Sequence, residues 1–332
     1  MIEPLSNEKA KEIFRELKVE CEYLFEFKIQ KAIPIHRGWL NLKWKLETDA
    51  GSFVLKQYNK ERYKMYNPEL LIQALHHQQR LHNNGVCCPK LLTYKNNVMH
   101  TSKNNERFIV LEHKEGNLIS PGKVNEKEIY SLGKTIGQMH NLLNDGSLIE
   151  GENPKFVPPT KEERLKHWED KRKEAEQLGK EHILSHIKLQ QEATQLVNID
   201  QFYSSKKGWV HRDLWVDNFL FHNDEVSAIL DFDRMDYDYV ELDIGRAVIS
   251  CALHDGVLNK SIVASFLAGY RNKLDFPIGS IVRAIQMLWY MESTWWIHTN
   301  MDQNSVPPSR FADEMNWIAE NYSALHNILA DL

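Results

Sequence analysis

One segment, residues 208–233, constrains the fold of this chain more than any other. It reads as a strand end, a loop that carries Asp213 and Asn218, a strand, a polar turn at residues 222–225 and a second strand that ends at Asp231. Such a hairpin brings an Asp and an Asn from one loop close to a second Asp across the turn. Oxygen-bearing side chains that converge on one point suit Mg²⁺, which takes carboxylates and substrate phosphates and keeps several waters. The alternative is an acidic turn on the surface.

The length and composition indicate a globular protein of two lobes. A chain of 332 residues is too long for one average domain and fits roughly two domains of ~100–200 residues each. Its hydrophobic content of 42%, its charged content of 26% and its nine Trp exclude a disordered chain, which would be poor in aromatic residues. The net charge of -5 comes without a clustered basic face, so we expect no nucleic acid partner.

The cysteines and the hydropathy pattern favour a cytoplasmic protein. The four cysteines include an adjacent pair, Cys87 and Cys88, that cannot easily bridge to itself, and their spacing does not match a zinc site. The first residues show no basic segment that leads into an apolar one, and no apolar run approaches the ~20 residues that span a bilayer. We therefore expect a soluble protein in a reducing cytosol, without a membrane partner.

The first part of the chain predicts a helix and then an antiparallel sheet. Residues 6–18 read as an amphipathic helix capped by Ser6, and from residue 23 to 58 the period of two predicts three strands. Gly38 and Asn41 lie in the first turn, and Lys56 lies near the end of the third strand. A flap with a glycine can lay backbone N–H groups over nucleotide phosphates, and an inward Lys56 can pair with them. The alternative is an ordinary hairpin with a solvated lysine.

The next helix offers an acidic partner for Lys56. Pro68 begins a helix that runs through residue 81, and a carboxylate on this helix would hold the lysine in place. Glu69, in the first turn, is our candidate. The alternative is that Glu69 is a solvated charge stabilised by the helix dipole.

Two further strands complete the first lobe, which we expect to span residues 1–112. They lie at residues 87–94 and 107–112 and bring the antiparallel sheet to five strands. The second strand ends in a polar segment, where backbone groups of Glu112, His113 and Lys114 are expected to receive an adenine edge. A hinge between the lobes falls here.

The second lobe, residues 113–332, is predicted to be mostly helical. The helical period begins at Asn125 and continues to about residue 199. Beyond the hairpin, residues 243–253, 260–273 and 280–299 read as helices, and a last helix begins at Arg310.

Taken in order, these features resemble the aminoglycoside phosphotransferase, choline kinase and type II homoserine kinase superfamily of small-molecule kinases. The resemblance covers about residues 30 to 300. Its strongest parts are Val-His-Arg-Asp-Leu-Trp-Val-Asp-Asn-Phe-Leu-Phe at residues 210–221 and Ile-Leu-Asp-Phe-Asp at residues 229–233. It implies an α+β, bilobal, protein-kinase-like fold and transfer of the γ-phosphate of ATP, with Mg²⁺, to a small hydroxyl compound.

The resemblance also implies roles for individual residues. Asp213 would orient the acceptor hydroxyl or accept its proton, Asn218 and Asp231 would hold the metal ions, and Lys56 would contact the α- and β-phosphates. His211 would be a scaffold residue of the loop.

A further segment, Glu-Leu-Asp-Ile-Gly-Arg-Ala at residues 241–247, is similar to the superfamily's segment that packs under the catalytic loop. Asp243 would therefore accept hydrogen bonds from the loop backbone.

Some residues depart from the superfamily pattern. The loop reads His-Arg-Asp where His-Gly-Asp is usual, which brings a protein kinase into consideration. Against this, Trp215 stands where Ser/Thr kinases have Lys, and no Ala-Pro-Glu follows. Arg212 is expected to pair with Asp236 or Asp238. The acidic residue of the helix, Glu69, lies in the first turn and not at the centre of the helix. This leaves open a catalytically weak or inactive kinase-fold binding protein, similar to the spore-coat kinase-like proteins.

The acceptor is expected to carry a cationic amine. Trp289, Glu292 and Trp296 fall on one helix face at i, i+3 and i+7, where an aromatic pair beside a carboxylate suits an amine. Asp233 is read as part of an acidic rim of the acceptor site, which favours a cation. The alternative is that both Trp residues belong to the core and Glu292 lies at its edge.

Overall fold

The computed structural model describes residues 6–36, 41–303 and 308–332, and the chain divides into two compact units. Unit 1 comprises Met1–Asn117 and Ser227–Met235, and unit 2 comprises Leu118–Val226 and Asp236–Leu332. The sequence placed a single boundary at residue 112. In the structure the boundary follows Asn117, and a short later segment, which includes Asp231, returns to unit 1.

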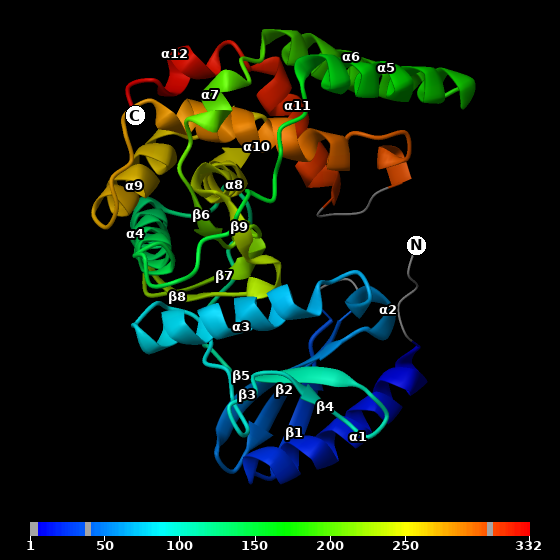
Figure 1. The fold of residues 1–332 in the computed structure, drawn as a ribbon, viewed down its shortest axis with the longest axis vertical. Helices are drawn as coiled ribbons and strands as arrows, with labels where there is room; N and C mark the ends of the chain where they lie inside the picture. Colours follow the sequence, from blue (N-terminus) through cyan, green and yellow to red (C-terminus); the bar gives the residue numbers. More distant parts are fainter. Residues whose placement is uncertain (1–5, 37–40, 304–307) are drawn as a thin grey trace. The chain divides into compact units, whose positions relative to one another are not determined.

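Unit 1 contains a five-stranded antiparallel sheet in the order β1-β2-β3-β5-β4 (Figure 1). The strands are β1 (Ile29–Pro34), β2 (Leu42–Thr48), β3 (Gly51–Tyr58), β4 (His100–Thr101) and β5 (Arg107–Glu112). The prediction of five strands is confirmed, but one of the five is misplaced. Residues 87–94 form the isolated bridges from Leu91 to Leu111 and from Tyr94 to Asn97, and the strand at the edge next to β5 is β4. Pro89 lacks a backbone N–H, which disfavours regular pairing there.

The first helix, α1 (Asn7–Phe25), is longer than predicted. Ser6 caps it as expected, because its side chain accepts a hydrogen bond from the amide of Lys9. Its buried residues Ile13, Leu17 and Cys21 repeat every four positions, so the apolar stripe continues beyond residue 18. The residues around 23–25, which were predicted to begin a strand, therefore complete the helix.

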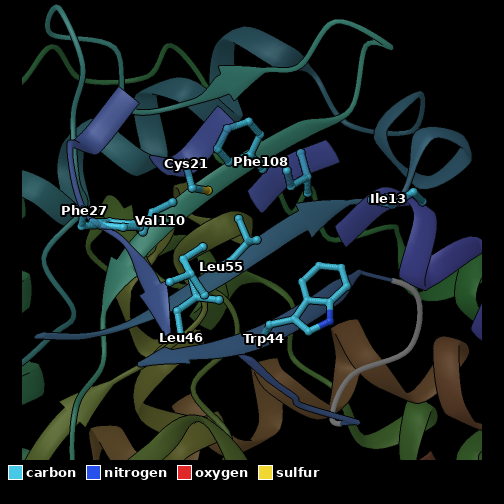
Figure 2. Close-up of a cluster of buried hydrophobic side chains, with 10 residues drawn as sticks. Ile13, Cys21, Phe27, Trp44, Leu46, Leu55, Phe108 and Val110 are labelled. Atoms are coloured by element: carbon cyan, nitrogen blue, oxygen red, sulfur yellow. The ribbon is translucent and has the colours of Figure 1, made fainter. Parts of the chain in front are cut away.

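Helices cover both faces of the sheet in unit 1. On one face α1 packs on alternate strand residues, among them Leu46, Leu55 and Val110 (Figure 2). On the other face α3 (Pro68–Asn83) packs through Leu71 and Leu75. A short helix, α2 (Lys60–Tyr63), follows β3. Because side chains alternate along a strand, Lys56 projects to the α3 face, next to buried Leu55 on the α1 face.

Unit 2 is mostly helical, as predicted. Every residue of α8 is buried, so this helix is the centre of the unit. The 280–299 prediction corresponds to α10, which packs against α8. The helices are α4 (Glu126–Leu143), α5 (Lys161–Gln177), α6 (Glu181–Leu196), α7 (Asp200–Tyr203), α8 (Val240–Ala252), α9 (Lys260–Arg271), α10 (Ser280–Trp296), α11 (Pro308–Glu320) and α12 (Leu325–Leu329).

Short strands and turns form the segment 208–233 and the residues that follow it. They are β6 (Lys207–Val210), η1 (Val216–Asn218), β7 (Phe219–His222), β8 (Glu225–Ile229), η2 (Phe232–Arg234) and β9 (Asp236–Tyr239). Asn223 and Asp224 have positive φ, as a tight hairpin turn requires. The antiparallel pairing of β6 with β9 was not predicted. Two further strands, β10 (Leu253–His254) and β11 (Val257–Leu258), pair with each other, and η3 spans Met301–Gln303.

The helices α4 and α9 approach each other closely at two glycines. A Cβ on Gly133 would lie 2.1 Å from the backbone oxygen of Phe266, and one on Gly269 would lie 2.0 Å from that of Tyr130. Both positions therefore require the absence of a side chain. Within the described ranges, no helix has both the length and the apolar character needed to cross a bilayer.

Candidate active site

Lys56 is the centre of a buried charge cluster in unit 1. Its Nζ lies 2.7 Å from Asp231 Oδ1 and 2.6 Å from Asp233 Oδ2. The Lys56 side chain is 4% exposed, so the ammonium group has lost most of its water. Both carboxylates come from the segment that returns to unit 1, and they replace the lost hydration.

A tight turn brings these two carboxylates together. Asp231 has φ 63° and ψ 63°, in the left-handed region, and immediately precedes η2. This conformation is uncommon for a non-glycine residue, although Asp tolerates it better than most. The turn reverses the chain so that residues two apart in sequence contact the same ammonium group.

The two carboxylates differ in exposure. The Asp233 side chain is 6% exposed, and its Oδ1 accepts a 2.9 Å hydrogen bond from the Tyr58 hydroxyl. The Asp231 side chain is 31% exposed, and its Oδ2 lies 3.9 Å from Lys43 Nζ. The prediction that Asp233 lies on an acceptor rim is wrong, because Asp233 is buried between Lys56 and Tyr58.

The cluster shifts the pKa values of Lys56 and Asp231. Burial opposes the charged form of Lys56, but Asp231 and Asp233 outweigh it and raise the pKa of the ammonium group. Burial likewise opposes ionisation of Asp231, but Lys56 and Lys43 outweigh it and hold its pKa well below the usual range. Lys56 and Asp231 are therefore both charged at neutral pH.

Glu69 does not take the place that the sequence suggested for it. It is exposed in the first turn of α3, where Asn67 caps the helix and Pro68 occupies its first position. The alternative, a solvated charge at the helix N-terminus, describes Glu69 as the structure has it. The carboxylates that contact Lys56 are Asp231 and Asp233 instead.

The other nucleotide candidates have local roles in unit 1. Gly38 lies outside the described residues. Asn41 accepts a hydrogen bond from the amide of Asn59 at 3.1 Å. At the end of β5, Glu112 pairs with Lys114 at 2.9 Å. Their contact with adenine stays a prediction.

The backbone at the end of β5 is partly engaged already. The amide of Glu112 donates to Lys90 O at 2.8 Å, and the amide of His113 donates to Ser52 O at 3.0 Å. An adenine edge would therefore have to meet the remaining carbonyl and amide groups of this segment.

In unit 2 a buried carboxylate holds the backbone of the loop that follows β6. Asp243, on α8, accepts the amide of His211 through Oδ2 and the amide of Arg212 through Oδ1, each at 2.7 Å. Arg212 has φ 62°, so the loop turns sharply at this residue. The sequence predicted that Asp243 accepts hydrogen bonds from the loop backbone, and these two contacts are of that kind. The scaffold role of His211 stays a prediction.

Asp213 and Asn218 of this loop contact each other. Asn218 Nδ2 donates to the backbone oxygen of Asp213 at 2.8 Å and to its carboxylate Oδ2 at 3.1 Å. The amide of Asp213 donates to His211 Nδ1 at 3.2 Å. Because its nitrogen faces Asp213, Asn218 presents its amide oxygen in the other direction.

A second layer supports Asp243. His140 Nε2, on α4, lies 3.0 Å from Asp243 Oδ2, and His140 Nδ1 lies 2.9 Å from the Tyr270 hydroxyl on α9. Burial opposes ionisation of Asp243, but the contacts with His140 and His211 outweigh it and lower its pKa. The carboxylate therefore stays ionised and can accept every one of these hydrogen bonds.

Arg212 forms the ion pair that the sequence predicted as one of two options. Its Nη1 lies 2.7 Å from Asp238 Oδ2 on β9. Asp236, the other option, lies 3.5 Å from Lys155 instead.

The expected amine site on α10 is not formed in the way predicted. Trp289 is completely buried and donates to Gln190 Oε1 on α6 at 2.6 Å. Glu292 is also buried, and it accepts hydrogen bonds from Arg246 and from Trp296, both at 3.0 Å. The alternative, that the aromatic residues are core, is correct for Trp289, whose face is not available to an acceptor.

The residues that would hold Mg²⁺ have suitable oxygen atoms. Asp231 in unit 1 keeps a partly exposed carboxylate, and Asn218 in unit 2 keeps its amide oxygen. Carboxylate oxygens and amide oxygens are both donor types that Mg²⁺ accepts. These residues therefore fit the ion on chemical grounds.

Three contributors were not identified from the sequence. Tyr58 lies two positions after Lys56, on the same face of β3, so the period of two was a usable signal. Lys43 pairs in register with Lys56 across β2 and β3, which only the pairing reveals. His140 is one of the buried residues of α4, and no residue near it in the sequence indicates that it contacts Asp243.

Comparison with known proteins gives a consistent result. The family described as "Phosphotransferase enzyme family" matches residues 31–276. The chain is 24% identical over 256 residues to a homoserine kinase of Rhodopseudomonas palustris (strain BisA53), which covers 75% of this chain and 73% of that protein.

Solved structures share the fold. An amicoumacin kinase in complex with AMP-PNP, Ca²⁺ and Ami aligns with a TM-score of 0.63 and 16% identity over 95% of this chain and 96% of that one. Choline kinase from Cryptosporidium parvum Iowa II aligns with a TM-score of 0.58 and 12% identity over 96% and 98%. These likenesses confirm the fold class that the sequence predicted.

Proposed function

This chain belongs to the phosphotransferase enzyme family, and on that premise we propose that it moves the γ-phosphate of ATP to a hydroxyl group of a small, amine-bearing molecule. Two contacts, one within each unit, carry the proposal. In unit 1, Lys56 and Asp231 are in contact. In unit 2, Asp213 and Asn218 are in contact on a loop held by Asp243. Phosphoryl transfer needs alignment and charge neutralisation, which these groups provide.

Each residue has a defined task in the proposed reaction. Lys56 contacts the α- and β-phosphates. The oxygen of the acceptor hydroxyl bonds to the γ-phosphorus as ADP leaves, and Asp213 accepts the proton of that hydroxyl. Asn218 and Asp231 would hold Mg²⁺, whose charge offsets that of the phosphates. Asp243 keeps the loop backbone in place, so that Asp213 does not have to be ordered when the acceptor arrives.

The amine on the acceptor is proposed from the relatives rather than from the α10 residues. Homoserine kinase and choline kinase are named for acceptors that contain both a hydroxyl and an amine or ammonium group. Asp233, which was expected to line an acidic acceptor rim, is paired with Lys56 within unit 1. The amine of the acceptor is therefore proposed without a named binding residue.

A coupled assay of nucleoside diphosphate release, ADP from ATP or GDP from GTP, tests the proposal. The acceptors are homoserine, choline, amino sugars, macrolides and methylthioribose, each with Mg²⁺ and either ATP or GTP. We expect turnover on at least one of them, and Asp213→Asn should lower kcat by about 10²–10⁴-fold because it removes the proton acceptor. Asp224→Asn, in the turn between β7 and β8, is the matched control and should leave kcat unchanged.

One outcome would contradict the proposal. Binding of Mg-ATP without Asp213-dependent turnover on any acceptor would favour the alternative, a kinase-fold protein that binds nucleotide without catalysis.

A further inference from the structure

Among the residues that the structure describes, Lys56 is held by a residue that the superfamily pattern did not assign. We propose that Asp233 is the positioning residue for Lys56, in place of an acidic residue on α3, and that this leaves Asp231 available to Mg²⁺. The inference rests on the proposed function and adds a role within it.

The first argument is the difference between the two carboxylates. Asp233 uses both oxygens inside unit 1, one for Lys56 at 2.6 Å and one for the Tyr58 hydroxyl at 2.9 Å. Asp231 shares Lys56 at 2.7 Å, but its side chain is 31% exposed, against 6% for Asp233. When phosphates contact Lys56, the exposed carboxylate can rotate away and keep its charge in water or on a metal. The buried one cannot leave without losing both partners.

The second argument is what α3 offers. Glu69 is the only acidic residue in the sequence of this helix, and it is exposed at its N-terminal end. The buried face of α3 carries uncharged residues such as Leu71 and Leu75, together with His77 and Gln78. The turn η2, which contains Asp233, packs against α3. The anchor for the lysine is therefore supplied by this turn and not by the helix.

The third argument concerns Tyr58. It lies on the same face of β3 as Lys56, and its hydroxyl donates to the oxygen of Asp233 that does not contact the lysine. This hydrogen bond fixes the rotation of the carboxylate and so aims the other oxygen at Lys56 Nζ. A lysine placed in advance contacts the phosphates at a smaller entropic cost.

One consequence distinguishes this arrangement from a protein kinase. In protein kinases the lysine pairs with an acidic residue on a helix, and the position of that helix controls activity. Here the lysine anchor, Asp233, and the proposed metal ligand, Asp231, belong to one turn. A displacement of α3 by itself would therefore not release Lys56 from its anchor.

The experiment measures ATP binding and kinetics in a set of variants. In titration calorimetry, Asp233→Asn should weaken ATP binding by about 10-fold or more, both with Mg²⁺ and with EDTA. The same variant should leave the Mg²⁺ concentration for half-maximal activity unchanged. Asp231→Asn should instead raise that concentration. Tyr58→Phe should weaken ATP binding by about 2- to 5-fold. Tyr66→Phe, on a ring 6.4 Å from that of Tyr58, is its matched control and should bind like the wild type.

A double-mutant cycle tests whether Asp233 acts through Lys56. In a Lys56→Met background, Asp233→Asn should cause no further loss of ATP binding. If it causes its full loss there, or if Asp233→Asn shifts the Mg²⁺ requirement as Asp231→Asn does, the inference is wrong. The double variant Lys56→Met/Asp233→Asn buries no unpaired ammonium, and Tyr58→Phe keeps the charges of Lys56 and Asp233. These two variants therefore still test the inference if Asp233→Asn alone folds poorly.

ATP binding also separates this inference from the proposed function. A wild-type protein that transfers phosphate to no acceptor would contradict the proposed function. The binding cycle of Lys56 and Asp233 would still decide the role of Asp233.

Discussion

Asp243 holds the backbone of the loop that carries Asp213. Its two oxygens accept the amides of His211 and Arg212, and His140 contacts one of them from a third element. Arg212 has a left-handed backbone, which costs about 1 kcal/mol or more in a residue with a side chain. The hydrogen bonds to Asp243 offset that cost.

Replacing Asp243 by Asn tests this dependence. The amide puts an N–H₂ group where an oxygen now accepts a backbone N–H, so one buried donor loses its partner. We expect a loss of about 2–4 kcal/mol in the free energy of unfolding, measured in urea, and a fall in kcat larger than any change in KM for ATP. Asp255→Asn, at a side chain 86% exposed, is the control. Unchanged kcat in a folded Asp243→Asn protein would contradict the scaffold role.

Among the elements, α3 carries a buried histidine that makes stability depend on pH. Burial, and to a smaller extent Arg80 and His76, lower the pKa of His77 from 6.5 to about 4. The depressed pKa means that the unfolded chain takes up a proton at a higher pH than the folded one. The contribution of His77 to stability is thus complete above about pH 6.5 and falls as the pH drops toward 4.

Between pH 7 and 4 we expect His77 to lower the free energy of unfolding by up to about 3 kcal/mol, since one pKa unit corresponds to ~1.4 kcal/mol. Urea unfolding at several pH values should show a shallower decline in stability for His77→Gln than for the wild type. His76→Gln, at an exposed position of the same helix, should decline like the wild type. Equal slopes for the wild type and His77→Gln would show that the histidine stays neutral in both states.

The elements also show how far sequence reasoning reaches. The periods of two and 3.6 predicted the strand that carries Lys56, the turn between β7 and β8 and the main helices of unit 2, because these patterns are local. The partner of Lys56 was not predictable in the same way. Asp233 is 177 residues away in the chain, and nothing near either residue shows that they meet.

The α10 residues show the same limit. A helical face of Trp289, Glu292 and Trp296 looks alike whether it faces an acceptor or the core. In the structure, Trp289 donates a hydrogen bond to Gln190 on α6, and Glu292 accepts one from Arg246 on α8. These partners are far away in the sequence, so the pattern of α10 alone could not reveal them. The loop around Asp213 was predictable because its polar residues are close together in sequence and its support, Asp243, belongs to a recognisable segment.

At the scale of the whole chain, unit 1 is discontinuous. Residues 227–235 return to it from the second half of the sequence and supply both carboxylates that contact Lys56. The same segment donates the amide of Ile229 to Cys87 O at 2.8 Å. A fragment that ends at residue 117 therefore buries a lysine without a counter-ion.

This discontinuity predicts how fragments of the protein fold. Residues 1–117 alone should lack a cooperative urea transition by near-ultraviolet circular dichroism, whereas the same residues joined to 227–235 by a Gly/Ser linker should show one. Lys56→Met in the shorter fragment should recover part of the difference, because it removes the unpaired charge. Identical transitions in the two fragments would mean that the returning segment contributes nothing to the stability of unit 1.

The close pair of α4 and α9 limits how this protein can evolve. Alanine is usually the better helix residue, by about 1 kcal/mol over glycine. At positions 133 and 269, however, its methyl group would meet the backbone of the opposite helix. The same two helices carry His140 and Tyr270, whose hydrogen bond leads to Asp243. A lineage that gained a methyl group at either glycine would have to separate the helices. The loop that carries Asp213 would then lose its present support.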